Sequence, residues 1–544
     1  MKKNLLIFIF IFILSLISFF NLWNTYFQQD EWYWFGQSIY ANQYGILNLF
    51  KVAGFHFIPL AGLLTAALYQ LFKLQFGYYI GFNLILHAIN SFLVYILGAH
   101  LADKKIAFLA SILFLVANTS QQATTWVGAS IALLPATFFA LISFILFLKY
   151  FEMSKKRYLI WSVLFLIISL GFKEDAVFLF GYYLLYAFFF QKRHFWKVLT
   201  FDAIFGIVYI AGRYVIEIIS PQAILLRQQA SFSGIISLAT HTLLFPLQAF
   251  SKLYFSPELM LPFSHFLMDR YAKEISFMVD IKSFGNFALF VENVGMKFVS
   301  VTLTTLLILT GSILLKKIGT INENLRTKIK TAFIFIVLSV LPYGFLPNNL
   351  GMESRHYYIP MIGASLLLSM IFYSIFYGLK SKFFKIVLMT VVIGYLGLNI
   401  YLNQRNIRYL METGRSRIIF VTQIQSLFTV LPQKTIFLSS GDPLTFQSGV
   451  GQMLMVLFRN HQPYFQLLRL NFLWDLGSQG YKEIGDKGFG YFNDFNLLKE
   501  TYVNYDIKPS SVFSFYWDSN KQKLIDTTEQ TRNKLVSDNS VIKR

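Results

Sequence analysis

Two adjacent carboxylates, Asp30 and Glu31, follow the first apolar segment of the chain in the sequence QQDEWYW. A carboxylate near a membrane surface can accept a proton from a hydroxyl group, or share a divalent ion with a phosphate. The competing interpretation is a solvated interfacial loop, because acidic side chains are common at exposed positions. The aromatic residues that follow, Trp32, Tyr33 and Trp34, are equally expected in the aromatic belt of a membrane interface.

A second charged group lies in the sequence GFKEDAVFLF, which contains Lys173, Glu174 and Asp175. These residues interrupt two apolar segments that are too short for a large loop between them, so they lie close to the bilayer boundary. Charged groups at that depth are usually paired or functional. A simple turn between two hairpin helices is the alternative.

The third group is MESRHYYIP, with Arg355, His356, Tyr357 and Tyr358. The guanidinium of Arg355 keeps its charge and presents a fork of donors that suits phosphate oxygens. Alternatively, Arg355 extends to the interface beside tyrosines of an aromatic belt. We favour a functional role.

Two histidines give weaker signals. His56 in GFHFIPL could bind a phosphate or a sugar hydroxyl, although a structural cap before the helix start at Pro59 is the simpler interpretation. His87 in NLILHAIN is expected to be satisfied within a helix bundle, because no second His or Cys lies at metal-ligand spacing.

The composition determines which elements must position these residues. The 544 residues are 56% hydrophobic and 18% aromatic but only 14% charged, with a mean hydropathy of +0.54, which excludes an ordinary soluble globule. The formal net charge of +20 lies in short clusters between apolar segments, so we expect no nucleic-acid partner. The absence of cysteine excludes disulfides and thiolate metal sites.

We therefore expect an all-α polytopic membrane protein with about eleven transmembrane helices and a small C-terminal α/β domain. The expected crossings lie near residues 5–23, 79–99, 106–119, 129–150, 158–172, 176–190, 198–218, 297–315, 329–346, 358–379 and 386–402. Residues 57–72 and 234–250 are expected to be helices at the membrane surface. The N-terminal segment is interpreted as a retained signal anchor, since no small-residue cleavage site follows it.

The basic loops support this count because they all fall on one side of the membrane. They contain Lys2 and Lys3, Lys104 and Lys105, Lys155–Arg157, Lys192 and Arg193, residues 316–330, and residues 380–385. The positive-inside rule places that side, and the N-terminus, in the cytoplasm. The three candidate groups and the C-terminus are then outside it. Soluble nucleotide-sugar donors are absent there, so an enzyme on that side must use a lipid-carried donor.

Residues 403–544 differ from the rest and are expected to form an extracytoplasmic α/β domain, following a transmembrane domain of residues 1–402. KTIFLSS predicts a strand, GVGQMLMVLF a helix, and SVFSFYW with QKLIDTT a hairpin. Residues 532–544 are expected to fray.

Four segments resemble, in order and spacing, the transmembrane O-mannosyltransferases with tetratricopeptide tails. They are HFIPLAGLLTAALYQLFKLQFGYYIGFNLILHAINSFLVYIL, TSQQATTWVGASIALLPATFFALISFIL, the Lys173–Asp175 turn and ESRHYYIPMIGASLLL. The DE pair with a downstream H-x-x-P is also similar to the protein O-mannosyltransferases. Both families belong to the GT-C class of polyprenyl-phosphate-sugar transferases. The resemblance covers roughly residues 20–190 and 340–380, and the tail lacks the tetratricopeptide pattern.

The resemblance implies a catalytic role for Asp30 as the base and for Glu31 as its neighbour. It implies that Arg355 and Lys173 hold the lipid phosphate, and that Glu174 and His56 are further site residues. His356 and Tyr358, which flank the arginine in the same motif, are included as substrate-binding candidates. No metal-ligand set is expected; members of the class are often metal-independent, and some use a divalent cation such as Mg²⁺ or Mn²⁺.

The expected activity is transfer of a hexose, such as mannose, from a polyprenyl-phosphate donor to an acceptor hydroxyl of a protein or glycan, with inversion. The Lys-, Phe- and Asn-rich composition favours a bacterial plasma membrane. Two other interpretations stay open. A transporter or lipid flippase predicts inverted repeats and ionisable groups near the bilayer midplane, and a non-catalytic scaffold predicts that the loop charges are dispensable.

Overall fold

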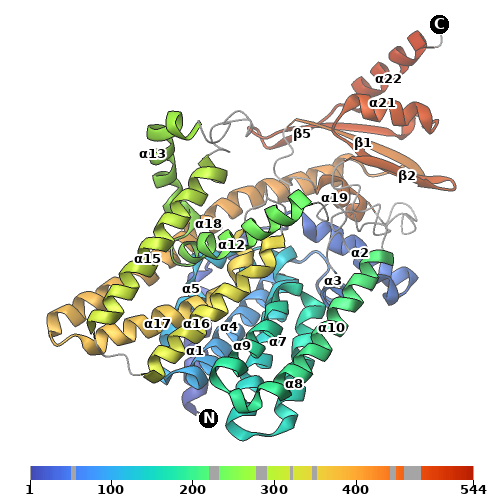
Figure 1. The fold of residues 1–544 in the computed structure, drawn as a ribbon. Coiled ribbons are helices and arrows are strands. Elements are labelled where there is room, and N and C mark those ends of the chain that lie inside the picture. Colours follow the sequence, from blue (N-terminus) through green and yellow to red (C-terminus); the bar gives the residue numbers. More distant parts are fainter. Residues whose placement is uncertain are drawn as a thin grey trace. The chain divides into compact units, whose positions relative to one another are not determined.

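The computed structural model describes residues 2–50, 57–219, 232–276, 291–318, 323–345, 352–441, 449–458 and 479–542. The candidate His56 lies outside the described residues. Figure 1 shows helices through most of the chain and a small sheet near the C-terminus.

Each of the eleven segments expected to cross the membrane contains a helix. The helices of the N-terminal part are α1 (Lys2–Ser18), α2 (Asp30–Tyr44), α3 (Pro59–Phe72), α4 (Phe76–Leu101), α5 (Lys104–Val116), α6 (Gln122–Thr125), α7 (Val127–Met153), α8 (Lys156–Phe172), α9 (Phe178–Phe190) and α10 (Phe195–Ile219). Those of the middle part are α12 (Phe232–Tyr254), α13 (Pro257–Ser276), α15 (Met296–Ile318), α16 (Glu323–Val340), α17 (Pro360–Gly378) and α18 (Lys382–Leu427).

Among the described residues, six helices are long and apolar enough to cross a bilayer. They are α4, α7, α17 and α18, with residues Lys192–Gly212 around α10 and Met296–Ile313 of α15. These helices are compatible with a membrane protein. The larger count of eleven stays a prediction, because helices such as α5 and α9 have only 13 residues each, which is shorter than a full bilayer crossing.

The chain divides into two compact units, which we call the bundle unit and the sheet unit. The bundle unit contains Met1–Phe19, Leu84–Thr124 and Leu133–Gln404, and the sheet unit contains Phe20–Asn83, Thr125–Ala132 and Arg405–Arg544. The domain boundary predicted at residues 402/403 falls inside α18, which continues without a break to Leu427.

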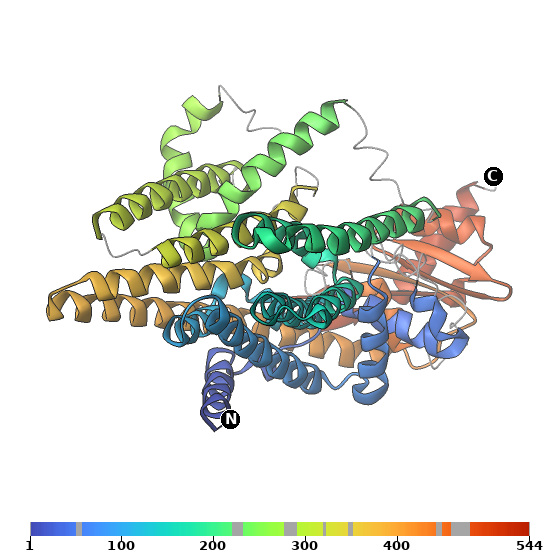
Figure 2. The same cartoon turned by 60° about the horizontal axis from the view of Figure 1, so that its bottom comes forward.

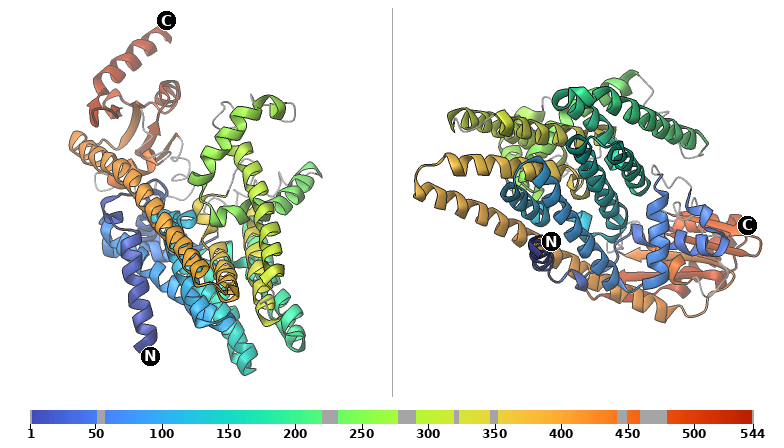
Figure 3. Two further views of the ribbon diagram at one scale, coloured as in Figure 1. Left: turned by 90° about the vertical axis from the view of Figure 1, so that its left-hand side faces the viewer. Right: turned by 90° about the horizontal axis from the view of Figure 1, so that it is seen from below.

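Aromatic side chains fill the interior of the bundle unit. The ring of Phe147 on α7 stacks on Tyr183 of α9 at 3.9 Å between centroids, and Phe144 stacks on Phe335 of α16 at 5.8 Å. The helix α17 turns back into α18 after Gly378, as Figure 2 shows in gold and orange. The N-terminal helix α1, dark blue in Figure 3, packs Ile11 against Ala88 and Leu115 of α4 and α5.

Within its described residues, the sheet unit contains a sheet of five strands in the order β2-β3-β1-β4-β5. The strands are β1 (Lys434–Gly441), β2 (Gly480–Ile484), β3 (Lys487–Phe492), β4 (Val512–Asp518) and β5 (Lys523–Asp526), and the helices beside them are α19 (Val450–Leu457), α21 (Phe495–Asn504) and α22 (Thr528–Ile542). Strand β1 is parallel to β3 and β4, and the two outer pairs are antiparallel. The predicted strand, helix and C-terminal hairpin of this region are confirmed.

Both faces of the central strand β1 are covered. Ile436 packs in one cluster with Leu498 of α21 and Leu535 of α22, whereas the ring of Phe437 lies 5.6 Å from that of Phe428, the residue directly after α18, on the other face. Burial of alternate residues on opposite faces follows from the twofold repeat of a strand.

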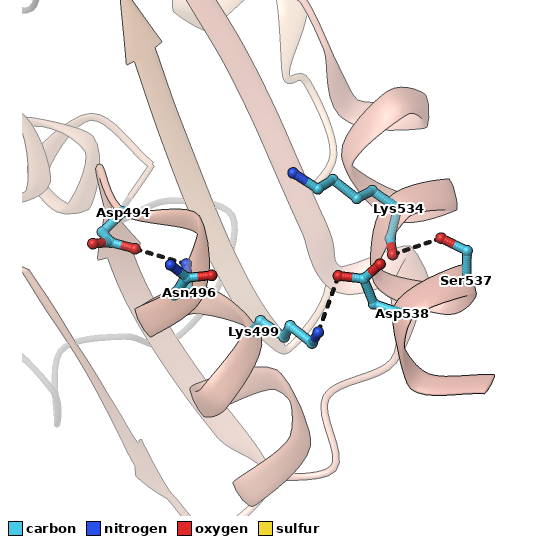
Figure 4. Close-up of polar contacts among 6 residues, drawn as sticks. All are labelled: Asp494, Asn496, Lys499, Lys534, Ser537 and Asp538. Carbon is cyan, nitrogen blue, oxygen red and sulfur yellow. Dashed lines mark hydrogen bonds and ion pairs between the residues drawn. The ribbon is translucent and has the colours of Figure 1, made fainter. Parts of the chain in front are cut away.

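The expectation that residues 532–544 fray is wrong as far as Ile542, because α22 continues through them. Figure 4 shows the reason: the Lys499 ammonium of α21 forms a 3.0 Å ion pair with Asp538 of α22. In addition, the ammonium of Lys534 lies 4.1 Å from the ring centroid of Phe495. Contacts between two helices that are separated in the sequence hold this terminus, and the polar composition gave no sign of them.

Candidate functional site

The two adjacent acids of the first candidate group have opposite environments. Asp30 is exposed at the first residue of α2, whereas Glu31 is only 1% exposed. One carboxylate oxygen of Glu31, Oε2, accepts hydrogen bonds from the backbone N–H groups of Gln28 at 3.2 Å and Gln29 at 2.9 Å. The other, Oε1, accepts from the backbone N–H of Gly128 at 3.2 Å.

Gly128 lies against both acids at the start of α7. A Cβ atom built on this glycine would lie 3.2 Å from the Cβ of Asp30 and 3.5 Å from the carboxyl carbon of Glu31. The backbone N–H groups at a helix N-terminus favour negative charge, and α7 directs one of them at Glu31. The segment TTWVGAS therefore contributes to the acidic pair, although we predicted no site residue in it.

Arg417 is a further member of this group that sequence reasoning missed. It lies on α18 and is 6% exposed. Burial lowers the pKa of the Arg417 guanidinium, and the negative charge of Glu31 opposes this shift. Gly414, one turn earlier, lets α18 approach closely, because a Cβ there would lie 3.0 Å from the backbone nitrogen of Tyr26. We refer to Asp30, Glu31, Gly128 and Arg417 as the acidic cluster.

Burial raises the pKa of the Glu31 carboxyl above its ordinary value. The neighbouring charge of Asp30 adds to this rise, and the backbone hydrogen bonds oppose it. Glu31 is thus a buried, fully engaged group, and Asp30 is the acid of the pair that solvent or a substrate hydroxyl can reach.

The start of α2 is fixed by an aromatic core. Trp32, Phe27 and Phe35 are fully buried, and their rings meet edge to face at 5.0–6.1 Å between centroids. Tyr79 of α4 joins the same cluster at 5.5 Å from Phe27. Trp32 is consequently a core residue and not part of an exposed aromatic belt.

The second and third candidate groups come together inside the bundle unit. The hydroxyl of Tyr343, in the 3₁₀ helix Leu341–Phe345, is hydrogen-bonded to the carboxylate of Asp175. The Tyr343 ring also packs on His356 at 4.8 Å between centroids. Arg355 forms a 2.7 Å ion pair with Glu353, and its side chain is 24% exposed. We refer to Asp175, Tyr343, Glu353, Arg355 and His356 as the arginine cluster.

The short 3₁₀ helix Ser354–Tyr357 holds Arg355 and His356 in place. The backbone N–H of Glu353 donates to Nδ1 of His356 at 3.1 Å, while the Glu353 side chain caps the same turn. The hydroxyl of Ser354 accepts a hydrogen bond from the backbone N–H of Gln122 at 3.2 Å. Gln122, Asp175 and Arg355, which belong to three of the segments that we compared with known transferases, therefore all lie in the bundle unit.

Lys173 and Glu174 are half-buried where α8 ends and the 3₁₀ helix Glu174–Val177 begins. The backbone N–H of Lys173 donates the last hydrogen bond of α8, to the carbonyl of Ser169 at 3.0 Å, and the backbone of Lys173 itself is extended. These residues adjoin Asp175, so they lie at the edge of the arginine cluster. Asp175, to which the sequence pattern assigns no role of its own, makes the contact with Tyr343.

Tyr358 has a different environment from its neighbours in the motif. It is fully buried, and its hydroxyl lies 2.7 Å from Nδ1 of His87 and 3.4 Å from the amide nitrogen of Asn90. The second ring nitrogen of His87 lies 3.0 Å from the carbonyl of Leu115. This geometry agrees with the expectation for His87 as a satisfied bundle histidine, and we assign Tyr358 no substrate contact below.

The acidic cluster belongs to the sheet unit and the arginine cluster to the bundle unit. Within the described part of the chain, no group of three or more His, Cys, Asp or Glu side chains is arranged to hold a metal ion. No family model and no curated protein matches this sequence.

Proposed function

We propose that this protein is a membrane glycosyltransferase that moves a hexose from a polyprenyl-phosphate donor to an acceptor hydroxyl outside the cytoplasm. The observation that carries the proposal is the contrast within the acidic pair. Asp30 is exposed, while the adjacent Glu31 is buried and bonded to three backbone N–H groups. This arrangement holds one acid in place and leaves the other for proton transfer.

In the proposed reaction the acceptor oxygen attacks the anomeric carbon and displaces the polyprenyl phosphate from the opposite face. The carboxylate of Asp30 takes the hydroxyl proton as the new C–O bond forms. The bond between the anomeric carbon and the phosphate oxygen breaks, and the lipid phosphate leaves as an anion. Such an in-line displacement inverts the anomeric centre.

Arg355 is proposed to stabilise the departing phosphate. Its guanidinium is held on a capped turn beside Tyr343 and His356 and remains partly exposed. Fixed cationic donors lower the barrier where negative charge develops. Lys173 is assigned a supporting role toward the same phosphate, and Glu174 and His356 are assigned supporting roles in substrate binding.

The test uses the full-length protein in detergent with polyprenyl-phosphate hexoses and a hydroxyl acceptor. Asp30→Asn should lower kcat by about 10²–10⁴-fold, the usual contribution of a general base. Arg355→Ala should lower kcat by a comparable factor, about 10²–10³-fold, as loss of a donor to a developing anion does.

Two control variants keep the comparison specific. Asp103→Asn replaces an exposed acid that caps α5 with another good capping residue, and Arg193→Ala removes an exposed arginine. Both should retain wild-type transfer. Full transfer by Asp30→Asn and Arg355→Ala would contradict the assignment of the site. Absence of transfer by the wild-type protein with every hexose donor would contradict the proposed transferase activity.

A transporter or lipid flippase is the second candidate, and one residue favours it. Asp202 lies in α10 and is 1% exposed, and neither of its carboxylate oxygens has a hydrogen-bond partner in the part of the chain that the structure describes. Ionisable side chains inside a membrane span often belong to ion or substrate pathways. Substrate movement in proteoliposomes that is abolished by Asp202→Asn but kept by Asp30→Asn would favour this candidate over the transferase.

A further inference from the structure

An apolar cavity of about 330 Å³ lies between α5, α17 and α18 of the bundle unit. Its walls include Phe108 and Ile112 of α5, Phe372 and Phe376 of α17, and Val392 of α18. This cavity is separate from the candidate site residues described above, since none of them lines it.

One end of the cavity is basic and aromatic. The ammonium of Lys105 donates to the hydroxyl of Tyr377 at 3.2 Å and lies 5.9 Å from the centroid of the same ring. The ring of Tyr373 lies 4.4 Å from Tyr377. An ammonium carries three donors, and the bond to Tyr377 uses one of them.

A second lysine adds positive charge at this end. The ammonium of Lys385 lies 5.4 Å from the ring centroid of Phe376, which lines the cavity. Lys105 and Lys385 lie in the first turns of α5 and α18, in two of the basic clusters that the charge pattern assigns to the cytoplasmic side.

The other end of the cavity is apolar. Ser369 and Tyr377 lie eight residues apart on α17, which corresponds to about 12 Å along the helix axis. Ile112 is seven residues from Lys105 on α5. Starting from the Lys105–Tyr377 contact, the residue numbers therefore rise along α5 and fall along α17, so the two helices line the cavity with opposite chain directions. Ser369 is fully buried, and its hydroxyl has no hydrogen-bond partner among the described residues.

We propose that this cavity binds one anionic phospholipid, with an acyl chain between the three helices and the phosphate at Lys105 and Lys385. The charge of the two lysines complements a negative headgroup, and the long apolar walls suit a hydrocarbon chain. Basic pockets between transmembrane helices on the cytoplasmic side are known to bind anionic headgroups. The tyrosine ring at the entrance suits the level of the headgroups.

The experiment titrates the delipidated full-length protein in detergent with phosphatidylglycerol or phosphatidylcholine of identical chains and counts bound lipid by native mass spectrometry. One phosphatidylglycerol should bind more tightly than phosphatidylcholine. The double variant Lys105→Ala/Lys385→Ala should lose this preference, by about fivefold in Kd for each lysine. Ser369→Leu should weaken the binding of both lipids, because the larger side chain occupies the apolar end.

Lys156→Ala is the matched control, since Lys156 is exposed at the start of α8 and the sequence places it on the same side. It should bind phosphatidylglycerol as the wild type does. Gel filtration of each variant separates a binding defect from misfolding. The double lysine variant changes only side chains outside the core, so the test stays valid even if Ser369→Leu does not fold.

Three results would overturn the proposal. The first is an unchanged preference for phosphatidylglycerol in the double lysine variant. The second is displacement of the lipid by millimolar inorganic phosphate, which would mean that the apolar cavity contributes nothing to the affinity for the lipid. The third is tighter binding of a polyprenyl phosphate than of phosphatidylglycerol, which would make the occupant a carrier lipid instead of a membrane phospholipid.

Discussion

Among single residues, Asp30 and Glu31 differ in burial, because the side chain of Glu31 lies inside the protein and that of Asp30 lies at the surface. Glu31 lies beneath the turn formed by Gln28 and Gln29 and receives a third hydrogen bond from Gly128. A buried acceptor with three donors resists displacement, because breaking these bonds would leave backbone N–H groups unsatisfied. Glu31 is accordingly a positioning residue, and Asp30 is left as the acid that can exchange protons.

Replacing Glu31 by Gln should destabilise the protein by about 1–3 kcal/mol, since the amide turns one of the two acceptor oxygens into a donor that faces a backbone N–H. The variant should also change the pH dependence. Burial raises the folded-state pKa of Glu31, so the wild-type protein loses stability as the pH rises from the ordinary glutamate value through that higher pKa. In Glu31→Gln this slope should disappear.

The measurement is the thermal unfolding midpoint in detergent between pH 4 and pH 8. Asp30→Asn serves as the comparison, because Asp30 is exposed whereas Glu31 is buried. An unchanged pH slope in Glu31→Gln would show that another group titrates in this window and that Glu31 is not the source.

Glu353 is expected to compete with the substrate for Arg355. The two side chains form a partly exposed ion pair of 2.7 Å, and such pairs contribute about 0–1 kcal/mol. Glu353→Gln removes the charge but keeps an acceptor for the helix cap. The KM for the polyprenyl-phosphate donor should fall by up to about fivefold with little change in kcat, and a higher KM would contradict the role given to Arg355.

At the scale of elements, the single helix α18 brings distant residues into the acidic cluster. Its 46 residues continue from Lys382 to Leu427, well past the predicted end of the crossing at residue 402. Gly414, Arg417 and Phe420 lie on the continuation, and the rings of Phe420 and of Phe428, directly after the helix, pack on the sheet. The position of Arg417 thus depends on how closely α18 approaches Thr25 and Tyr26.

Gly414→Ala tests this dependence. The added methyl group would lie 3.0 Å from the nitrogen of Tyr26 and 3.1 Å from the carbonyl carbon of Thr25, and such overpacking costs about 1–3 kcal/mol. We expect a lower unfolding temperature and reduced transfer. Gly397→Ala on the same helix meets nothing within 4 Å and should be neutral or stabilising by up to about 1 kcal/mol. Equal behaviour of the two variants would exclude a packing role for Gly414.

At the scale of the whole molecule, the charge pattern makes a prediction about topology that the absence of cysteine makes simple to test. Single cysteines can be introduced at Asp30, Lys104, Glu174, Lys380 and Arg405 in a background with none. A membrane-impermeant maleimide applied to intact cells should label positions 30, 174 and 405, and should label 104 and 380 only after lysis. Labelling of 30 and 174 from opposite sides would refute the topology on which the transferase proposal rests.

Much of the secondary structure could be predicted from local patterns. Long apolar segments such as 79–99 and 129–150 became α4 and α7, and the short apolar run in KTIFLSS became β1. The hairpin of β2 and β3 was not predicted, although the sequence IGDK at its turn is a recognisable turn signal. In the structure, Gly485 in this turn has a φ of +63°. The candidate site was predicted in part, because Asp30, Lys173 and Arg355 carry charges next to apolar segments.

Hydropathy and charge along the chain are enough to place the apolar helices and the charged loops between them, because both are local properties. The three-dimensional packing buries Glu31, leaves Asp30 exposed, and adds Gly128 and Arg417 to the acidic cluster. It also joined Asp175 to Tyr343 and formed the cavity beside Lys105. These contacts join residues far apart in the chain, and they arise from close packing of whole helices, which no local pattern records.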